Sequence, residues 1–318
     1  MQFTLLRTAI GVSVLALATG PFAIAGPLDC ATPGSPCNDQ ITSLGRFVVD
    51  ITNPAIQAIF AGSPPPGYDP SSHLFMSPLL FDPNTLIGRS TSFADGSADD
   101  TTNPIPVGTG PMAITTTGDP ALKPSGFPTG NTEIHTAVLD MNLAAGGFQV
   151  LAGASMTAHH QNSPGEVESI GGAGFPASSF FDIFVDVEIP GLGTLYTDAP
   201  LLVQNPSIDA LPPTVIYVHG ASSPAPLKFN AGGPAWSAGD TLGTILLSGH
   251  GANYSPNGTG QNNDAGAFNQ QFKQLADSSG DPRLATFVDA QLPEPSTTVL
   301  LFSALAALGS RAIRRKRS

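Results

Sequence analysis

The chain has little charge, and very little positive charge. Charged residues make up 11% of its 318 residues, less than half the share of an ordinary soluble protein. Half of its 12 Lys and Arg residues lie in the first ten or the last eight positions, so residues 26–292 hold six basic residues against 23 acidic ones, a net charge of −17. An acidic field of this kind repels phosphate backbones and anionic lipid. We therefore expect no nucleic-acid partner; divalent cations or a cationic matrix match this charge better.

Cysteine, tryptophan and tyrosine are also scarce, at two, one and four residues. The sequence has no Cys-x-x-Cys redox pair and no phosphate-cradling glycine loop, and it has too few large aromatics for a clustered sugar-binding face. The two cysteines, Cys30 and Cys37, flank the turn-forming residues 32–36. In an oxidising compartment such a close pair predicts a local Cys30–Cys37 disulfide, with free thiols as the alternative.

Glycine and proline, by contrast, are abundant, and 35 Gly with 31 Pro make about a fifth of the chain. Frequent turn residues and few strong helix formers favour short strands, while the content of Ile, Val, Leu and Phe is too high for a fully disordered chain. We expect an all-β protein with an antiparallel, β-sandwich-like body of short strands, an N-terminal signal helix and a C-terminal hydrophobic helix. The body divides into a turn-rich part, residues 26–132, and a strand-rich part, residues 133–291.

The clearest strand patterns lie in this second part. Apolar side chains occupy every second position in residues 134–143 and again in residues 182–189. Glycine-containing turns follow both, so residues 148–153 and 194–197 complete two hairpins. The side chains expected to share an inner face are Ala137, Leu139, Met141 and Leu143 in the first strand and Ile183, Val185, Val187 and Ile189 in the second. Further strands are expected at residues 201–204, 214–219, 227–230 and 242–248.

Two segments have the spacing of a helix. Residues 39–61 are the best helical candidate of the first half, with Pro54 placed as a first helical residue behind Asn53. Phe268 and Phe272 predict a short helix over residues 264–277. Between the first helix and the first hairpin, residues 62–132 predict either a meander of short strands or a poorly ordered stretch.

One pair of motifs resembles the chemistry of α/β-hydrolases. His219-Gly220 ends an apolar run, as in the strand before an oxyanion hole, and Ser237 stands in a near match to the Gly-x-Ser-x-Gly nucleophile elbow. Such an enzyme needs a histidine beside the serine and an acid that orients it. The only later histidine, His250, follows Ser237 by thirteen residues, which leaves no room for the acid strand. The pattern favours a strand that ends in a turn, and we assign no catalytic residue.

The densest set of potential metal ligands is His159 and His160 followed by Glu166 and Glu168. Zinc needs three or four converging donors, usually at helical or hairpin spacing, whereas a turn separates these histidines from the acids. We expect a solvated loop here and no metal centre.

Two groups of acids offer weaker alternatives. Asp95, Asp99 and Asp100 supply oxygens for an opportunistic calcium site, but without EF-hand spacing. The acids of residues 182–188 could pair as in a glycosidase, yet alternation on one strand predicts a solvent-facing side. These acids are Asp182, Asp186 and Glu188. Calcium is thus the single cofactor left open, and none is assigned.

The first 25 residues have the form of an export signal. Arg7 supplies positive charge, residues 9–18 are mostly apolar, and Ala23-Ile24-Ala25 has the small-x-small pattern of a cleavage site. Gly20 and Pro21 interrupt the apolar run before it reaches the length of a membrane span. We expect residues 1–25 to be a signal peptide cleaved after Ala25.

The last 27 residues, 292–318, join three features in order. Pro293-Glu294-Pro295 is followed by an apolar run over residues 299–309 and by a basic tail over residues 311–317. The basic residues are Arg311, Arg314, Arg315, Lys316 and Arg317. This combination resembles the PEP-CTERM sorting signal of Gram-negative-type bacteria. The resemblance covers the two ends of the chain and not its body.

The resemblance implies recognition by an exosortase-type membrane transpeptidase, cleavage at or near Pro293-Glu294-Pro295, and delivery to the cell surface or outside. Members of this family commonly occur in bacteria that make exopolysaccharide. Exopolysaccharide or another surface component is therefore an expected partner of this chain. Eleven apolar residues span about 16 Å as a helix against a hydrocarbon core of about 30 Å, so membrane anchoring is expected to be transient, with the tail on the cytoplasmic side. We expect a non-enzymatic envelope or matrix protein; the alternatives are a secreted hydrolase of polysaccharide or ester, and a carbohydrate- or calcium-binding module.

Overall fold

The protein folds as an antiparallel sheet with three short helices in the part of the chain that the structure, a computed structural model, describes. This part comprises residues 37–89, 124, 126–128, 133–161, 163–171, 175–220, 224–256 and 265–292. The expected all-β class is confirmed. The expected signal helix and C-terminal hydrophobic helix lie outside these residues, and among the described helices none is long and apolar enough to cross a membrane.

The sheet closes on itself around eight strand positions of the described chain. Four long strands fill one position each: β1 (Cys37–Ile51), β4 (Leu80–Arg89), β5 (Glu133–Ala145) and β14 (Thr241–Ala252). Each other position is shared by two shorter strands, β6 (Phe148–Gly153) with β7 (Ser163–Ser169), β9 (Asp186–Ile189) with β8 (Ala177–Ile183), β10 (Gly193–Tyr196) with β11 (Leu201–Ile208), and β13 (Ala225–Phe229) with β12 (Val215–His219). β1 pairs with both β4 and β14, so hydrogen bonds run around the whole sheet.

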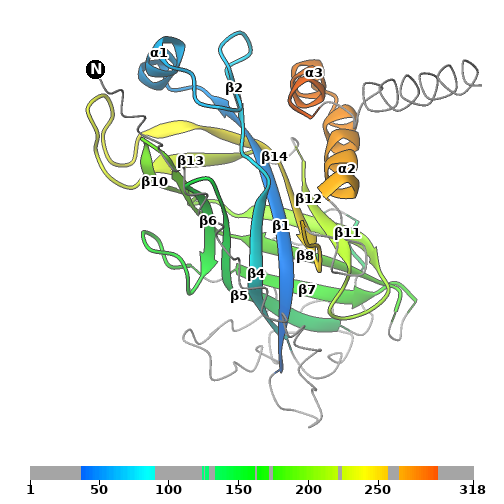
Figure 1. Ribbon diagram of the computed structural model, residues 1–318. Helices are drawn as coiled ribbons and strands as arrows, with labels where there is room; N and C mark the ends of the chain where they lie inside the picture. Colours follow the sequence, from blue (N-terminus) through cyan, green and yellow to red (C-terminus); the bar gives the residue numbers. More distant parts are fainter. Residues whose placement is uncertain are drawn as a thin grey trace, which may run out of the picture.

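Both halves of the body contribute to this closed sheet. β5 pairs with β4 on one side and with β6 and β7 on the other, while β14 pairs with β1 on one side and with β12 and β13 on the other. Two small strands, β2 (Tyr68–Asp69) and β3 (Leu74–Met76), extend the sheet beside β1. In Figure 1, β1 and β4 cross β7, β8 and β11 at a large angle. The described body is thus one closed sheet whose opposite walls pack on one inner core, and not the sandwich of two sheets that the sequence predicted.

The prediction of a helix over residues 39–61 is wrong for its first part, because residues 39–51 belong to β1. β1 is covered on both faces. Phe47 and Val49 point into the inner core, while Leu44 and Val48 pack in a second, outer core. A strand buried on both faces reads as a continuous apolar run, which hides the period of two.

The second part of that helix is confirmed as α1 (Pro54–Gly62). The side chain of Asn53 accepts hydrogen bonds from the backbone N–H groups of Ala55 and Ile56, at 3.1 and 3.3 Å. Pro54 occupies the first helical position, where its missing N–H needs no partner.

The outer core lies between the sheet and two C-terminal helices, α2 (Ala265–Ser278) and α3 (Pro282–Gln291) (Figure 1). α2, which was expected, buries Phe268 and Phe272 against β14. A Cβ at Gly249 would stand 3.1 Å from the Phe272 ring, so glycine there allows the helix to approach closely. α3 was not expected, although Asp281 caps its N-terminus as Asn53 caps α1.

Both predicted hairpins are present, but the alternation expected in β5 is interrupted. Met141 and Leu143 point into the inner core, whereas Ala137 and Leu139 pack together in a separate cluster. Leu139 is the extra residue of a bulge, because Val138 and Asp140 pair with consecutive residues of β4. β5 also changes partner from β7 to β6 at this point. The prediction that all four residues share one inner face was therefore wrong. In residues 183–189 the expected inner face is confirmed.

Candidate functional site

The three residues considered for a hydrolase do not converge. Ser237 lies on the exposed loop between β13 and β14, with its N–H donating to Asp240. His250 lies nine residues beyond Thr241, the first residue of β14, about 30 Å away at the rise of a strand. His219 is 1% exposed inside the sheet, with Nδ1 3.0 Å from the carbonyl oxygen of Leu202. No nucleophile–base pair forms among them.

The two histidines and the two acids considered as metal ligands differ in their exposure to solvent. The His159 ring stacks on Tyr196 at 3.9 Å, and His160 is exposed. Glu166 and Glu168 are 0% exposed on β7, so the expected solvated loop is wrong for these acids. Among the described residues, no group of three His, Cys, Asp or Glu side chains could hold a metal ion.

The acids of residues 182–188 were expected to face solvent, and this is wrong for two of them. Asp182 and Asp186 are buried, and Glu188 is half-buried. The Asp186 carboxylate accepts the backbone N–H groups of Thr157 and Ala158, at 2.7 and 2.6 Å. It therefore fastens the link between β6 and β7 to the sheet, a structural role.

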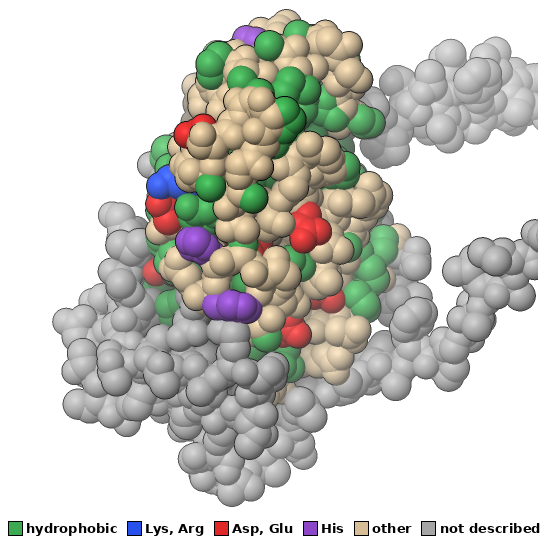
Figure 2. Space-filling model, turned by 90° about the vertical axis from the view of Figure 1, so that its left-hand side faces the viewer, with side chains coloured by type: hydrophobic (Ala, Val, Ile, Leu, Met, Phe, Trp, Pro, Cys, Tyr) green, Lys and Arg blue, Asp and Glu red, His purple; other side chains and the backbone are tan. Residues whose placement is uncertain are grey.

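Charged side chains do not gather on the face of the molecule shown in Figure 2, where acids and histidines are scattered and Lys and Arg are sparse. Trp236, the residue best suited to stack on a sugar ring, is half-buried. Its indole stacks on Phe229 at 4.7 Å, and a Cβ at Gly233 would stand 2.2 Å from the indole ring, so the Gly233 backbone lies against it.

Several predicted site residues lie outside the described residues. These are the possible calcium ligands Asp95, Asp99 and Asp100, and the sorting residues Pro293, Glu294, Pro295, Arg311, Arg314, Arg315, Lys316 and Arg317. Cys30 lies outside as well, and Cys37 is described only as the first residue of β1. The disulfide, the calcium site and the sorting signal stay predictions.

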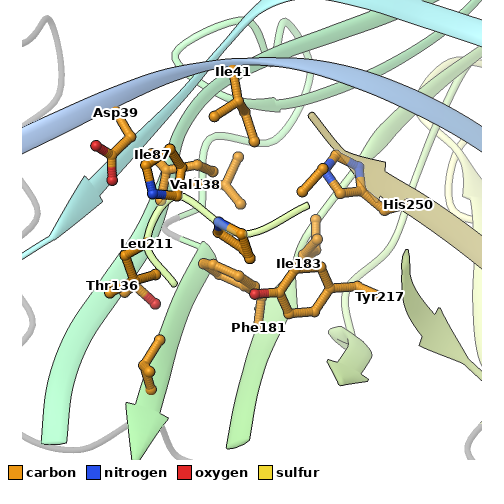
Figure 3. Close-up of a pocket in the computed structure, with 14 residues that line it drawn as sticks. Asp39, Ile41, Ile87, Thr136, Val138, Phe181, Ile183, Leu211, Tyr217 and His250 are labelled. Atoms are coloured by element: carbon orange, nitrogen blue, oxygen red, sulfur yellow. The ribbon is translucent and has the colours of Figure 1, made fainter. Parts of the chain in front are cut away.

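The inner core holds a cavity of about 30 Å³ at one end of the closed sheet, lined by residues of β1, β4, β5, β7, β8, β12 and β14 (Figure 3). Residues 211–213 cross this end and complete the wall. Asn253 holds the crossing segment in place through a hydrogen bond from Nδ2 to the carbonyl oxygen of Pro213, 2.8 Å long. We call residues 211–213 the strap.

The wall of this cavity is mostly aliphatic, with four polar side chains from four strands: Asp39, Thr136, Tyr217 and His250. Figure 3 shows Asp39 and His250 on opposite sides, with the rings of Phe181 and Tyr217 below. The Tyr217 hydroxyl donates to Ser179 Oγ at 2.9 Å. Burial raises the pKa of Tyr217, so the phenol stays protonated.

His250 is neutral in the folded protein at neutral pH. Burial lowers its pKa to about 4, because the interior disfavours the charged imidazolium. Its Nε2 lies 3.4 Å from Ser43 Oγ, whereas its buried Nδ1 has no hydrogen-bond partner. Thr136 Oγ1 is likewise buried without a partner, and the residue is 1% exposed. The cavity thus combines apolar walls with two unpartnered polar atoms.

A second cavity of about 40 Å³ lies next to the first in the inner core. Ile183 lines both cavities. The further wall of the second is formed mainly by aliphatic side chains such as Met141, Val150 and Val203. The inner core therefore contains two neighbouring spaces with the Ile183 side chain between them.

Comparisons with family models, curated proteins and solved structures give no match for this chain. Of the residues that line the cavity, the sequence identified Ile183 as inward-facing and His250 only as a possible catalytic base. A polar residue at an inward position of a strand is a signal for such a site. Thr136 lies two residues before the inward-facing Val138. The bulge at Leu139 interrupts the alternation, so the sequence pattern placed Thr136 on the wrong face of the strand.

Proposed function

We propose that this chain is an exported bacterial protein that is sorted to the cell surface or the surrounding matrix, where its body acts without catalysing a reaction. The sorting part of this proposal is supported by the order of features in residues 292–318: Pro293-Glu294-Pro295, an apolar run and a basic tail. The N-terminus of the same chain has the form of an export signal. The partner of the tail is then an exosortase-type transpeptidase. Attachment of the tail to the membrane is transient because its apolar run is short.

The acidic body agrees with a place outside the cell. A net charge of −17 over residues 26–292 favours solubility and repels anionic lipid. Within the described residues, the long strands pair on both sides, which protects the sheet from adding strands of other chains. Exopolysaccharide or another surface component is the partner class that this location offers.

A role without catalysis is supported by where the candidate catalytic groups lie. Ser237 is far from His250 along β14, and Asp186 is engaged with the backbone of the β6–β7 link. A secreted hydrolase would need a nucleophile and a base within hydrogen-bond reach. Of the alternatives, a binding module agrees better with the cavity in the inner core than a hydrolase does.

Intact mass spectrometry of the protein recovered from a host that bears an exosortase tests the sorting proposal. We expect the mature protein to begin after Ala25 and to lack the basic tail. Replacing residues 293–295 by alanine should leave the tail attached. The matched control replaces Pro64-Pro65-Pro66, a proline run on the body, by alanine and should be processed as the unaltered chain is. Recovery of an unaltered chain that still ends in Arg-Lys-Arg-Ser would refute the proposal.

A further inference from the structure

The cavity beneath the strap contains polar atoms that need a partner. Thr136 Oγ1 and His250 Nδ1 line the same space, are buried, and make no hydrogen bond within the protein. A buried polar atom without a partner destabilises a protein by about 1–3 kcal/mol, and most such atoms in native proteins are paired. Each of these atoms can take a hydrogen bond from a molecule bound in the cavity.

From this arrangement we propose that the cavity binds a small uncharged molecule, mainly apolar, with one hydroxyl or carbonyl group hydrogen-bonded to Thr136 Oγ1. The aliphatic wall favours an apolar body, and the unpartnered Thr136 hydroxyl favours one group that accepts or donates a hydrogen bond. This inference concerns the body alone and does not depend on how the chain is sorted.

Charge excludes the ionic alternatives. An anion would face the Asp39 carboxyl, and the described wall holds no Lys or Arg to balance it. Asp39 already takes part in another interaction, so its carboxyl group does not require a cationic ligand. The imidazole of His250 is neutral at neutral pH, because burial holds its pKa at about 4. An uncharged ligand is the class that remains.

Size sets a further limit. A cavity of about 30 Å³ has room for about two water molecules, or for a hydroxyl with the start of a short chain. A longer chain would pass Ile183 and enter the second cavity, of about 40 Å³. The strap, which is anchored at Pro213 through Asn253, forms part of the wall that a ligand has to pass.

Methyl NMR of the purified protein, titrated with straight-chain alcohols from 1-propanol to 1-hexanol, tests this proposal. We expect saturable shifts of the Ile41, Val138 and Ile183 methyl signals, with shifts in the second cavity only for the longer alcohols. Thr136→Val keeps the shape of the side chain but removes the hydroxyl, so it should weaken alcohol binding about five- to tenfold. Xenon, which makes no hydrogen bond, should bind both forms equally.

Two further variants keep the test decisive. Thr136→Ser retains the hydroxyl and should retain alcohol binding, even if Thr136→Val folds poorly. Thr244→Val, on β14 but outside both cavities, should leave binding unchanged. The proposal is overturned if no alcohol gives a saturable shift, if Thr136→Val binds alcohols as tightly as the unaltered protein, or if the cavity holds ordered water only and admits no probe.

Discussion

The inner and outer cores of this molecule share strands β1, β12 and β14 but are filled differently. In the outer core, Phe268, Phe272 and Phe287 pack from two helices onto strands whose glycines allow close approach. In the inner core, two cavities remain, and Thr136 and His250 keep polar atoms without partners. The same sheet thus has one face packed closely by aromatic side chains and another that holds empty space.

Cavities and unpartnered polar atoms both lower the free energy of unfolding, and apolar side chains of matching shape would remove them. In the outer core, Phe268 and Phe272 fill the space between α2 and the sheet. We infer that the lower free energy of unfolding is tolerated in the inner core because its space is used for binding.

Truncation in the outer core is expected to have the largest effect. Phe272 is 1% exposed in α2, so Phe272→Ala should lower the free energy of unfolding by about 3–5 kcal/mol. Urea unfolding measures this change. Phe175→Ala, at a phenylalanine that is 41% exposed, is the control and should cost about 1 kcal/mol or less. Equal losses in the two variants would mean that the helices do not pack as described.

Acid should weaken the inner core next. Folding lowers the pKa of His250 from its ordinary 6.5 to about 4, so its contribution is fully present above pH 6.5 and is lost as the pH falls towards 4. At pH 4.5 we expect about 2–3 kcal/mol less stability from this residue. Burial lowers the pKa of His219 as well, which acts in the same direction.

Urea unfolding at pH 7.5 and pH 4.5 checks this prediction. His250→Gln should reduce the loss in acid by about 2 kcal/mol, because the proton-binding group is gone. His160→Gln, at an exposed histidine, should show the full loss. An unchanged pH dependence in His250→Gln would contradict the burial of a neutral imidazole.

The smallest expected effect compares two buried threonines. Thr136 Oγ1 has no partner, so Thr136→Val should raise the free energy of unfolding of the ligand-free protein by about 1 kcal/mol. Thr85 donates to Asp82 at 2.8 Å, so Thr85→Val should lower it by about 1–3 kcal/mol. Thermal and urea unfolding give the sign of each change, and a loss of equal size in both would show that Thr136 has a partner within the protein.

Local signals in the sequence predicted the elements that depend on neighbouring residues. Alternation identified the inner face of residues 183–189, Asn53 and Pro54 marked the start of α1, and phenylalanine spacing located α2. β1 was missed because both of its faces are covered, which depends on helices more than 200 residues away. α3 was missed although Asp281 and Pro282 repeat the cap of α1.

The cavity could not be predicted in the same way. Asp39 on β1 and His250 on β14 are more than 200 residues apart, and they line the same cavity because β1 pairs with β14. Burial of the acids on the outer side of β7 and β8 also escaped prediction, because alternation shows which side chains share a face and not whether that face is covered. The export and sorting segments needed only local patterns, and they stay predictions.

A high-resolution crystal structure of the protein, grown with 1-butanol, tests the central claim most directly. We expect 1-butanol in the inner core, with its hydroxyl group within hydrogen-bond distance of Thr136 Oγ1. A cavity that holds water only, or that has closed around the Thr136 side chain, would contradict this claim.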